Sequence, residues 1–219
     1  MGLLDNALDS DSLPRGRHGL SRADVARSQR GRLCLALIDI TAEVGFHSLS
    51  INSIARRANV SKKAFYEQFQ SLDDCFADAL RACVGVAVTE IDKAVAAEGP
   101  GLPPWQRLLD ISISAYLDTL ASEPGAARVM HTEAASVGPI SADARLQMVA
   151  IFADRMRVLS EIAETQDPTG IRPRERSYEY FVYGLDGTVW AHLATRTPES
   201  LPELAAPIVS AARALFLRP

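Results

Sequence analysis

A short polar segment carries the side chains with the clearest chemistry in this chain. Lys62 and Lys63 follow Ser61, and Tyr66 comes one helical turn later. If this segment is helical, the three side chains share one face, because positions three and four apart are neighbours on a helix. Lysines neutralise phosphates or donate to guanine O6 and N7, and a tyrosine hydroxyl donates to a phosphate oxygen. The segment predicts a nucleic-acid-binding face, with a solvated face of an ordinary helical bundle as the alternative.

The distribution of charge indicates an anionic partner for this part of the chain alone. The 219 residues include 23 Lys and Arg against 27 Asp and Glu, which gives a formal net charge of −4. Residues 15–71 hold ten basic and four acidic residues and carry +6, whereas residues 72–219 carry −7. A basic segment ahead of an acidic body favours a polyanion as partner of the basic segment.

Three helices are expected to position these side chains. Ser21 caps a first helix with apolar residues every three or four positions, and Gly45 ends it in a left-handed conformation. Ser50 caps a second helix of about two turns, and Asn59 stands where the following turn needs a left-handed residue. Ser61 then caps the third helix. This order is typical of a helix-turn-helix, whose last helix enters the DNA major groove by its N-terminal residues.

The remaining sequence is also predicted to be helical. Long apolar stripes with helical spacing are separated by proline and glycine at residues 99–104, 138–139 and 167–170. Pro124 should open a short helix, Ser141 a long one and Pro173 the next, and Pro207 should bend the last helix. No alternating strand pattern longer than a few residues occurs. The fold class is therefore predicted to be all-α, with about nine helices.

The predicted helix-turn-helix resembles that of a known family. Gly-Phe at 45–46, the run Ser-Ile-Asn-Ser-Ile-Ala-Arg-Arg-Ala-Asn-Val-Ser-Lys-Lys-Ala-Phe-Tyr-Glu-Gln-Phe at 50–69, and Ser71 are similar to the motif of the tetracycline-repressor (TetR) family. The strong resemblance covers about residues 22–90, and the body matches in helix count alone. It implies a flexible arm at residues 1–20, a helix-turn-helix DNA-binding domain at 21–71, and a helical effector-binding and dimerisation domain at 72–219.

The resemblance also implies a set of DNA-contacting residues. Lys62, Lys63 and Ala64 would meet base edges or nearby backbone, Asn52 a base or phosphate, and Tyr66 and Gln68 phosphates. By the same resemblance, four apolar side chains would hold the domain together, namely Phe65, Phe69, Ile54 and Val60.

Three residues depart from the family pattern. Asn59 replaces the usual turn glycine, Gln68 stands where histidine is common, and Leu72 occupies a position often held by a phosphate-binding lysine. Losing that cation weakens binding to any sequence and shortens the salt slope by roughly 0.9. Arg15 and Arg17 would compensate by following the DNA backbone into a minor groove, or they belong to a disordered arm.

The same family implies a dimer built from the last two helices and a ligand site in the body. Gly184 and Gly187 support the dimer independently, because they remove side chains where another helix can approach closely, although an intrachain role is the alternative. Candidates for the ligand site are polar or aromatic residues on apolar faces, with methionines as adaptable lining. They are Tyr116, His131, Glu133, Phe152, Tyr178, Asp186 and Trp190, together with Met130, Met148 and Met156. For each of them, ordinary core packing or helix capping is the alternative.

Other functional classes find little support. The chain contains no GxSxG, P-loop, GxGxxG or HExxH motif and no Glu-x-x-His pair, so we expect no enzyme, no metal site and no cofactor. No apolar run approaches the roughly 18 residues of a membrane span. The start of the chain is acidic and resembles no secretory signal. Cys34, Cys75 and Cys83 form no CxxC pair, which predicts buried thiols in a reducing cytoplasm.

Together these features predict a dimeric DNA-binding regulator of transcription. Its expected partners are double-stranded DNA with a palindromic operator, a second copy of the chain, and a small, largely apolar effector that releases a repressor from the operator. The alternative is a helical ligand-binding adaptor without specific DNA binding, which Leu72 and the acidic total charge favour.

Overall fold

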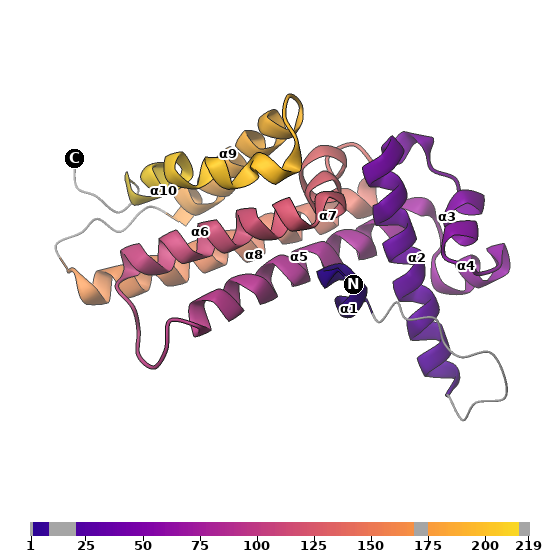
Figure 1. The fold of residues 1–219 in the computed structure, drawn as a ribbon, viewed down its shortest axis with the longest axis horizontal. Coiled ribbons are helices and arrows are strands. Elements are labelled where there is room, and N and C mark those ends of the chain that lie inside the picture. The colour runs from indigo at the N-terminus through magenta and orange to yellow at the C-terminus, as the bar shows by residue number, and fades with distance from the viewer. Residues whose placement is uncertain (1, 9–20, 169–174, 215–219) are drawn as a thin grey trace. The chain divides into compact units, whose positions relative to one another are not determined.

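The structure, a computed structural model, describes residues 2–8, 21–168 and 175–214 (Figure 1). Every regular element in these ranges is helical, which confirms the all-α prediction. The α-helices are α1 (Leu3–Ala7), α2 (Arg22–Val44), α3 (Ile51–Arg57), α4 (Lys62–Gln68), α5 (Leu72–Ala96), α6 (Trp105–Ser122), α7 (Pro124–Arg128), α8 (Pro139–Gln166), α9 (Glu175–Leu193) and α10 (Ala205–Ala214). Short 3-10 helices cover Phe46–Ser48 and Pro198–Leu204, and a π-helical turn covers Val129–Glu133.

The chain forms two compact units. Unit 1 lies within residues 1–86 and 123–145, and unit 2 lies within residues 87–122 and 146–219. Unit 1 thus contains the predicted helix-turn-helix together with the first turns of α5, α7, the π-helical turn and the start of α8. The division into arm, DNA-binding domain and effector domain is a functional one and stays a prediction.

The predicted caps and turns around the helix-turn-helix are confirmed. The Asp24 amide donates to Ser21 Oγ at 3.1 Å, the Ser53 amide to Ser50 Oγ at 3.1 Å, and the Ala64 amide to Ser61 Oγ at 3.0 Å. The chain turns with positive φ at Gly45, +77°, and at Asn59, +53°. Each serine satisfies an amide that has no partner inside its helix, and thus fixes where that helix begins.

The core of unit 1 is built on α2. This helix packs against α3, α4 and α7, and Figure 1 shows α3 and α4 lying beside it. Ile54, Phe65 and Phe69 are almost completely buried, as predicted, whereas Val60 is half-buried. Burying a side chain of this size contributes about 1.5–3 kcal/mol. Large buried side chains of α2 and α5 complete this core: Leu33, Leu37, Ile38, Phe76 and Leu80.

The three cysteines are buried and free, which confirms their prediction as small core residues. A hydrogen bond with Cys75 and burial together raise the pKa of the Cys34 thiol well above its usual value, and burial raises that of Cys83 as well. A raised pKa keeps both groups as thiols at neutral pH, so they behave as apolar packing groups.

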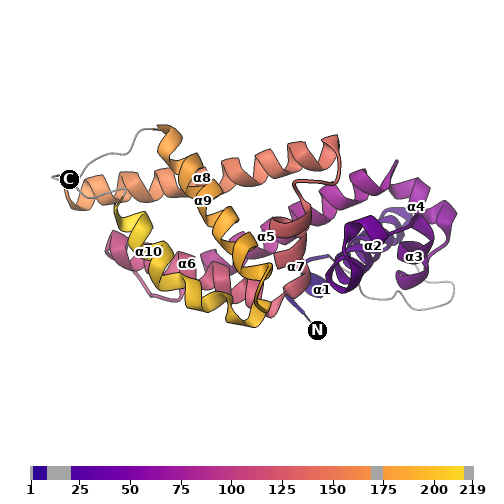
Figure 2. The same ribbon diagram turned by 90° about the horizontal axis from the view of Figure 1, so that it is seen from above.

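Unit 2 is organised around α6. The 3-10 helix Pro198–Leu204 and α10 both pack against α6, and Figure 2 shows α10 alongside it. The Trp105 amide at the start of α6 donates to Gln166 Oε1 at the end of α8, at 2.8 Å. Arg213 Nη2 in α10 lies 2.7 Å from both carboxylate oxygens of Asp110. These polar contacts fix the register of α8 and α10 on α6.

The structure corrects several expected boundaries. Residues 3–7, assigned to a flexible arm, form helix α1, whose Leu4 is buried and whose first amide donates to Glu123. The long helix begins at Pro139 rather than Ser141, because Asp73 supplies its N-terminal cap. The short helix from Pro124 passes into a π-helical turn at residue 129.

The last helix also differs from the prediction. The chain runs as a 3-10 helix to Leu204, and the α-helix begins only at Ala205. Pro207 therefore lies in the first turn of α10, where an amide donor is not needed, so no bend is required. Arg15, Arg17 and Pro173 lie outside the described residues.

Candidate nucleic-acid interface

The N-terminal half of α4 presents a basic and aromatic face. Lys62, Lys63 and Tyr66 are all exposed, and 53% of the Tyr66 surface is accessible. Lys62 Nζ lies 6.0 Å from the centre of the Tyr66 ring, which packs edge-on against the buried ring of Phe65. Because its ring packs against a core residue, the Tyr66 side chain is held in place while it faces outward.

The positive charge of this face is only weakly compensated. Lys63 Nζ lies 3.7 Å from Glu67 Oε1, and both side chains are largely exposed. An exposed pair of this kind contributes about 0.5 kcal/mol or less, so it does not prevent either lysine from binding a phosphate.

The other residues predicted to contact DNA differ in their exposure. Asn52 is exposed on α3, and Gln68 is half-buried at the end of α4. Ala64 is buried, because it lies on the inner side of α4 with Phe65. The expected approach of the Ala64 side chain to a base edge is thus not supported, and a contact through its backbone stays a prediction.

Arg56 is an exposed cation that the sequence motif did not single out. It lies four residues after Asn52, and therefore on the same face of α3. Its neighbour Arg57 donates to Glu43 at 2.9 and 2.7 Å, and this contact raises the pKa of Arg57 and lowers that of Glu43. Within the described residues Arg56 makes no such ion pair. Only tertiary structure separates these adjacent arginines, since their partners come from another helix.

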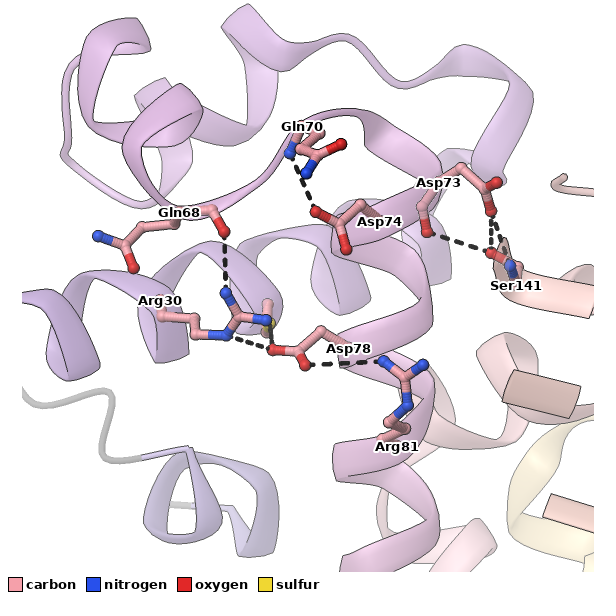
Figure 3. A network of polar contacts seen from close by, with 9 residues as sticks. Arg30, Gln68, Gln70, Asp73, Asp74, Asp78, Arg81 and Ser141 are labelled. Carbon is pink, nitrogen blue, oxygen red and sulfur yellow. Dashed lines mark hydrogen bonds and ion pairs between the residues drawn. The ribbon is translucent and has the colours of Figure 1, made fainter. Parts of the chain in front are cut away.

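Two arginines of α2 donate hydrogen bonds to the C-terminal ends of α3 and α4. Arg30 Nη1 donates to the carbonyl oxygen of Gln68 at 2.8 Å, and Arg30 Nε donates to Asp78 Oδ2 at 2.8 Å (Figure 3). Arg32 Nη1 donates to the carbonyl oxygen of Ala58 at 3.3 Å. Partial burial lowers the pKa of Arg30, but the hydrogen bond and charge of Asp78 outweigh it, so that the pKa is raised. The basic count of the sequence includes both arginines, but nothing in their spacing marks this role.

The link between α4 and α5 is fastened as well. The Gln70 amide donates to Asp74 Oδ2 at 3.0 Å, and the Asp74 amide donates to Ser71 Oγ at 3.1 Å, so Ser71 caps the start of α5. One residue earlier, Asp73 points toward the first turn of α8 and accepts hydrogen bonds from the Ile140 and Ser141 amides at 3.0 and 2.9 Å (Figure 3).

The residues proposed for a ligand fall into both units. Met130, His131 and Glu133 are buried in the π-helical turn of unit 1. Glu133 Oε1 lies 3.9 Å from Arg128 Nε, and Arg128 also donates to the carbonyl of Ala42 at 3.1 Å. This gives Glu133 a structural partner that the sequence did not reveal.

In unit 2 several of these residues converge. The rings of Tyr116 and Phe152 meet edge-on with centres 5.2 Å apart, and burial together with the charge of Asp186 raises the pKa of Tyr116. The buried hydroxyl of Tyr178 has no hydrogen-bond partner among the described residues. Trp190 is 52% exposed, which corrects its expected place in an interior site. The remaining candidates, Met148 and Met156, are buried.

Comparison with known proteins gives a match for the segment that contains α3 and α4. Residues 36–79, which include α3, α4 and the Arg30 partner Asp78, match the sequence profile described as "Bacterial regulatory proteins, tetR family". Over these residues the chain is similar to TetR-family regulatory proteins. None of the curated protein sequences matches it.

Solved structures share the fold over most of the chain. The transcriptional regulator FadR from Bacillus subtilis, in complex with stearoyl-CoA, is 15% identical with a TM-score of 0.69, covering 83% of this chain and 96% of that one. FadR from Bacillus halodurans is 16% identical with a TM-score of 0.70, covering 84% and 94%. A transcriptional regulator from Rhodococcus sp. Rha1 is 23% identical with a TM-score of 0.60, covering 87% and 99%. At these identities the likeness concerns the fold.

The described residues hold no group of three or more His, Cys, Asp or Glu that is placed to bind a metal ion. The same residues contain no helix with the length and apolar character that crossing a bilayer requires.

Proposed function

We propose that the protein is a dimeric transcriptional regulator that binds double-stranded DNA through α3 and α4 and is controlled by a small effector. The observation that carries this proposal is the exposed face of Lys62, Lys63 and Tyr66 at the start of α4, within the segment that matches the TetR-family profile. Helices of this kind enter the major groove by their first residues.

The contacts of each side chain follow from its chemistry and position. Lys62 and Lys63 reach base edges or the adjacent backbone, and Tyr66 donates to a phosphate. Asn52 on α3 reaches a base or phosphate, as the sequence predicted. We add Arg56 as a phosphate contact, because it is exposed beside Asn52 and its charge is not paired in the described structure. A further phosphate contact from Gln68 is part of the proposal.

A homodimer built from α9 and α10 would present two such faces. Gly184 and Gly187 lie on an exposed face of α9, where an added Cβ would meet no atom within 4 Å. Exposed aromatic residues accompany them, with Tyr180 69% and Trp190 52% accessible. An apolar face opened by glycines allows close approach of a second helix. Two-fold symmetry then matches a palindromic operator with half-sites roughly 34–36 Å apart.

The proposed effector site lies in the helical body. The Bacillus subtilis FadR structure contains stearoyl-CoA, which is a long apolar chain with a polar head. In this chain, Tyr116 and Phe152 offer an aromatic wall, and Tyr178 and Asp186 are buried polar groups that can orient a ligand. Effector binding would release a repressor from its operator in the cytoplasm.

Selection from a random duplex pool tests the DNA-binding function. The wild-type protein should enrich a palindrome, and Lys62→Ala should change the base preference at one or two symmetric positions. Arg107→Ala is a matched control, because it removes one exposed cation from unit 2, where Arg107 pairs with Glu98. If no sequence is enriched at low salt, the chain is instead a ligand-binding adaptor.

Light scattering tests the dimer. A mass of about twice the 23.7 kDa chain is expected at micromolar concentration for the wild type, and a mass near one chain for Gly187→Arg. Gly85→Arg is a suitable control, because a Cβ at Gly85 on α5 likewise meets no atom within 4 Å. A wild-type mass near 24 kDa contradicts the dimer.

A further inference from the structure

Helix α4 is too short to fix its own orientation on the domain. It has only seven residues, and the chain leaves it at Phe69 in an extended conformation, with φ −137° and ψ 140°. So short a helix is not stable by itself, and its last carbonyls have no partners within the helix. Phe65 and Phe69 anchor it to the core, but apolar burial is not directional. A directional contact at this end of the helix can therefore set the angle at which Lys62, Lys63 and Tyr66 leave the surface.

Arg30 makes three contacts at this end of the helix. Its guanidinium donates to the carbonyl oxygen of Gln68 and to Asp78 Oδ2, both at 2.8 Å, and its central carbon lies 4.4 Å from the centre of the Phe69 ring. Figure 3 shows the group lying between the end of α4 and the α5 carboxylate. A planar guanidinium held by two acceptors and a ring has a defined orientation, which a lysine ammonium would lack.

Asp78 fixes the guanidinium in turn. It accepts from Arg30 and from the Cys34 thiol, whose sulfur lies 3.6 Å away, and Arg81 on the same helix lies within 3.9 Å. The charge of Arg30 is therefore balanced inside the protein, unlike the charges of Lys62 and Arg56.

We propose that Arg30, held by Asp78, is a positioning residue that sets the orientation of the recognition helix α4 and so determines the sequence specificity of DNA binding, without itself contacting DNA. This inference rests on the proposed DNA-binding function. It predicts that losing Arg30 disturbs base reading, which depends on the angle of α4, more than phosphate binding, which tolerates small shifts.

The test compares two DNA affinities in each variant. The duplex that the wild type selects and a random-sequence duplex are titrated with wild type, Arg30→Gln, Arg30→Lys and Arg107→Gln over a range of salt concentrations. The control Arg107→Gln removes the same charge from an exposed ion pair with Glu98 in unit 2. We expect Arg30→Gln to reduce the preference for the selected duplex roughly ten-fold, equivalent to losing about one good base contact. Its affinity for random duplex and its salt slope should match those of the control, and Arg30→Lys should fall between.

Other outcomes overturn the proposal. An unchanged preference in Arg30→Gln shows that the contact does not position α4. A salt slope shortened by roughly 0.9, with equal loss of both affinities, shows that Arg30 is a phosphate contact instead. If Arg30→Gln does not fold, Asp78→Asn provides the same comparison, because it leaves Arg30 in place and removes its anchor.

Hydrogen exchange separates this proposal from the function on which it rests. Amides of residues 65–69 should exchange at least about ten-fold faster in Arg30→Gln than in Arg107→Gln, with no DNA present. If the wild type selects no DNA sequence but this difference is seen, the proposed function fails and the positioning contact stands. Equal exchange in both variants overturns the positioning contact, whatever the DNA result.

Discussion

Replacing Asp73 with alanine should destabilise unit 1 by removing the cap of α8. The Asp73 carboxylate accepts from the Ile140 and Ser141 amides at 3.0 and 2.9 Å, and from the Ser141 hydroxyl. A Cβ at Gly138 would lie 2.5 Å from this carboxylate, so the glycine keeps the space open. Losing an N-cap costs about 1 kcal/mol, and leaving the amide of the buried Ser141 unpaired adds about 1 kcal/mol. We expect the free energy of unfolding to fall by about 2 kcal/mol.

Thermal unfolding and hydrogen exchange measure this effect. For a chain of this size, about 2 kcal/mol corresponds to a fall in Tm of about 4 to 8 °C. The Ile140 and Ser141 amides should lose protection in the variant. Asp118→Ala is the matched control, because Asp118 is an exposed carboxylate within a helix, and it should change stability by about 0.5 kcal/mol or less. If Asp73→Ala unfolds at the same temperature as Asp118→Ala, the assigned role of the cap is wrong.

The contribution of Asp73 should also depend on pH. Partial burial raises its pKa, but the hydrogen bonds from Ser141 and Ile140 outweigh burial, so the pKa lies below its ordinary value of 3.8. A lowered carboxyl pKa means that its stabilisation is present above about pH 4 and is lost as the pH falls further. The difference in stability between wild type and Asp73→Asn should therefore be constant near neutrality and narrow in acid. A difference that widens below pH 4 contradicts the assignment.

Substitutions at three further positions have defined effects, measured by denaturant unfolding or, for Gly31, by sensitivity to protease. Asn59→Ala should lower the free energy of unfolding by about 1 kcal/mol, because alanine tolerates φ of +53° poorly, whereas Asn59→Gly should change it little. In Gly31→Ala, the added Cβ would collide with the Leu8 carbonyl, so α1 should undock, expose Leu4 and become sensitive to protease. Thr41→Val should be neutral or stabilising, since the buried Thr41 hydroxyl has no hydrogen-bond partner among the described residues. A loss of more than about 1 kcal/mol in Thr41→Val would contradict that assignment.

Local sequence rules were sufficient for the helix-turn-helix. Ser21, Ser50 and Ser61 are capping residues whose partners lie three positions away, and Gly45 and Asn59 are the residue types that adopt positive φ. Such signals act within one helical turn, so they can be identified without knowing the fold.

Contacts between distant residues could not be predicted in the same way. Asp73 looks like an acidic residue in the first turn of its own helix, yet it caps a helix 67 residues further along the chain. Arg56 and Arg57 are equivalent in sequence, but only Arg57 lies within reach of Glu43. Trp190 is a large aromatic residue of the kind expected in a core, but the packing of α9 leaves it exposed.

The sequence by itself determined the all-α class, the limits of α2 and α3, the start of α4, and the outward direction of Lys62 and Tyr66, because helical period and capping are local properties. Tertiary structure alone decided how the recognition helix is held. Arg30, Asp78 and the Gln68 carbonyl come from three helices, and their hydrogen bonds form only when α2, α4 and α5 pack together. The orientation of α4 is therefore a property of the packed domain, although the sequence shows which side chains of α4 face outward.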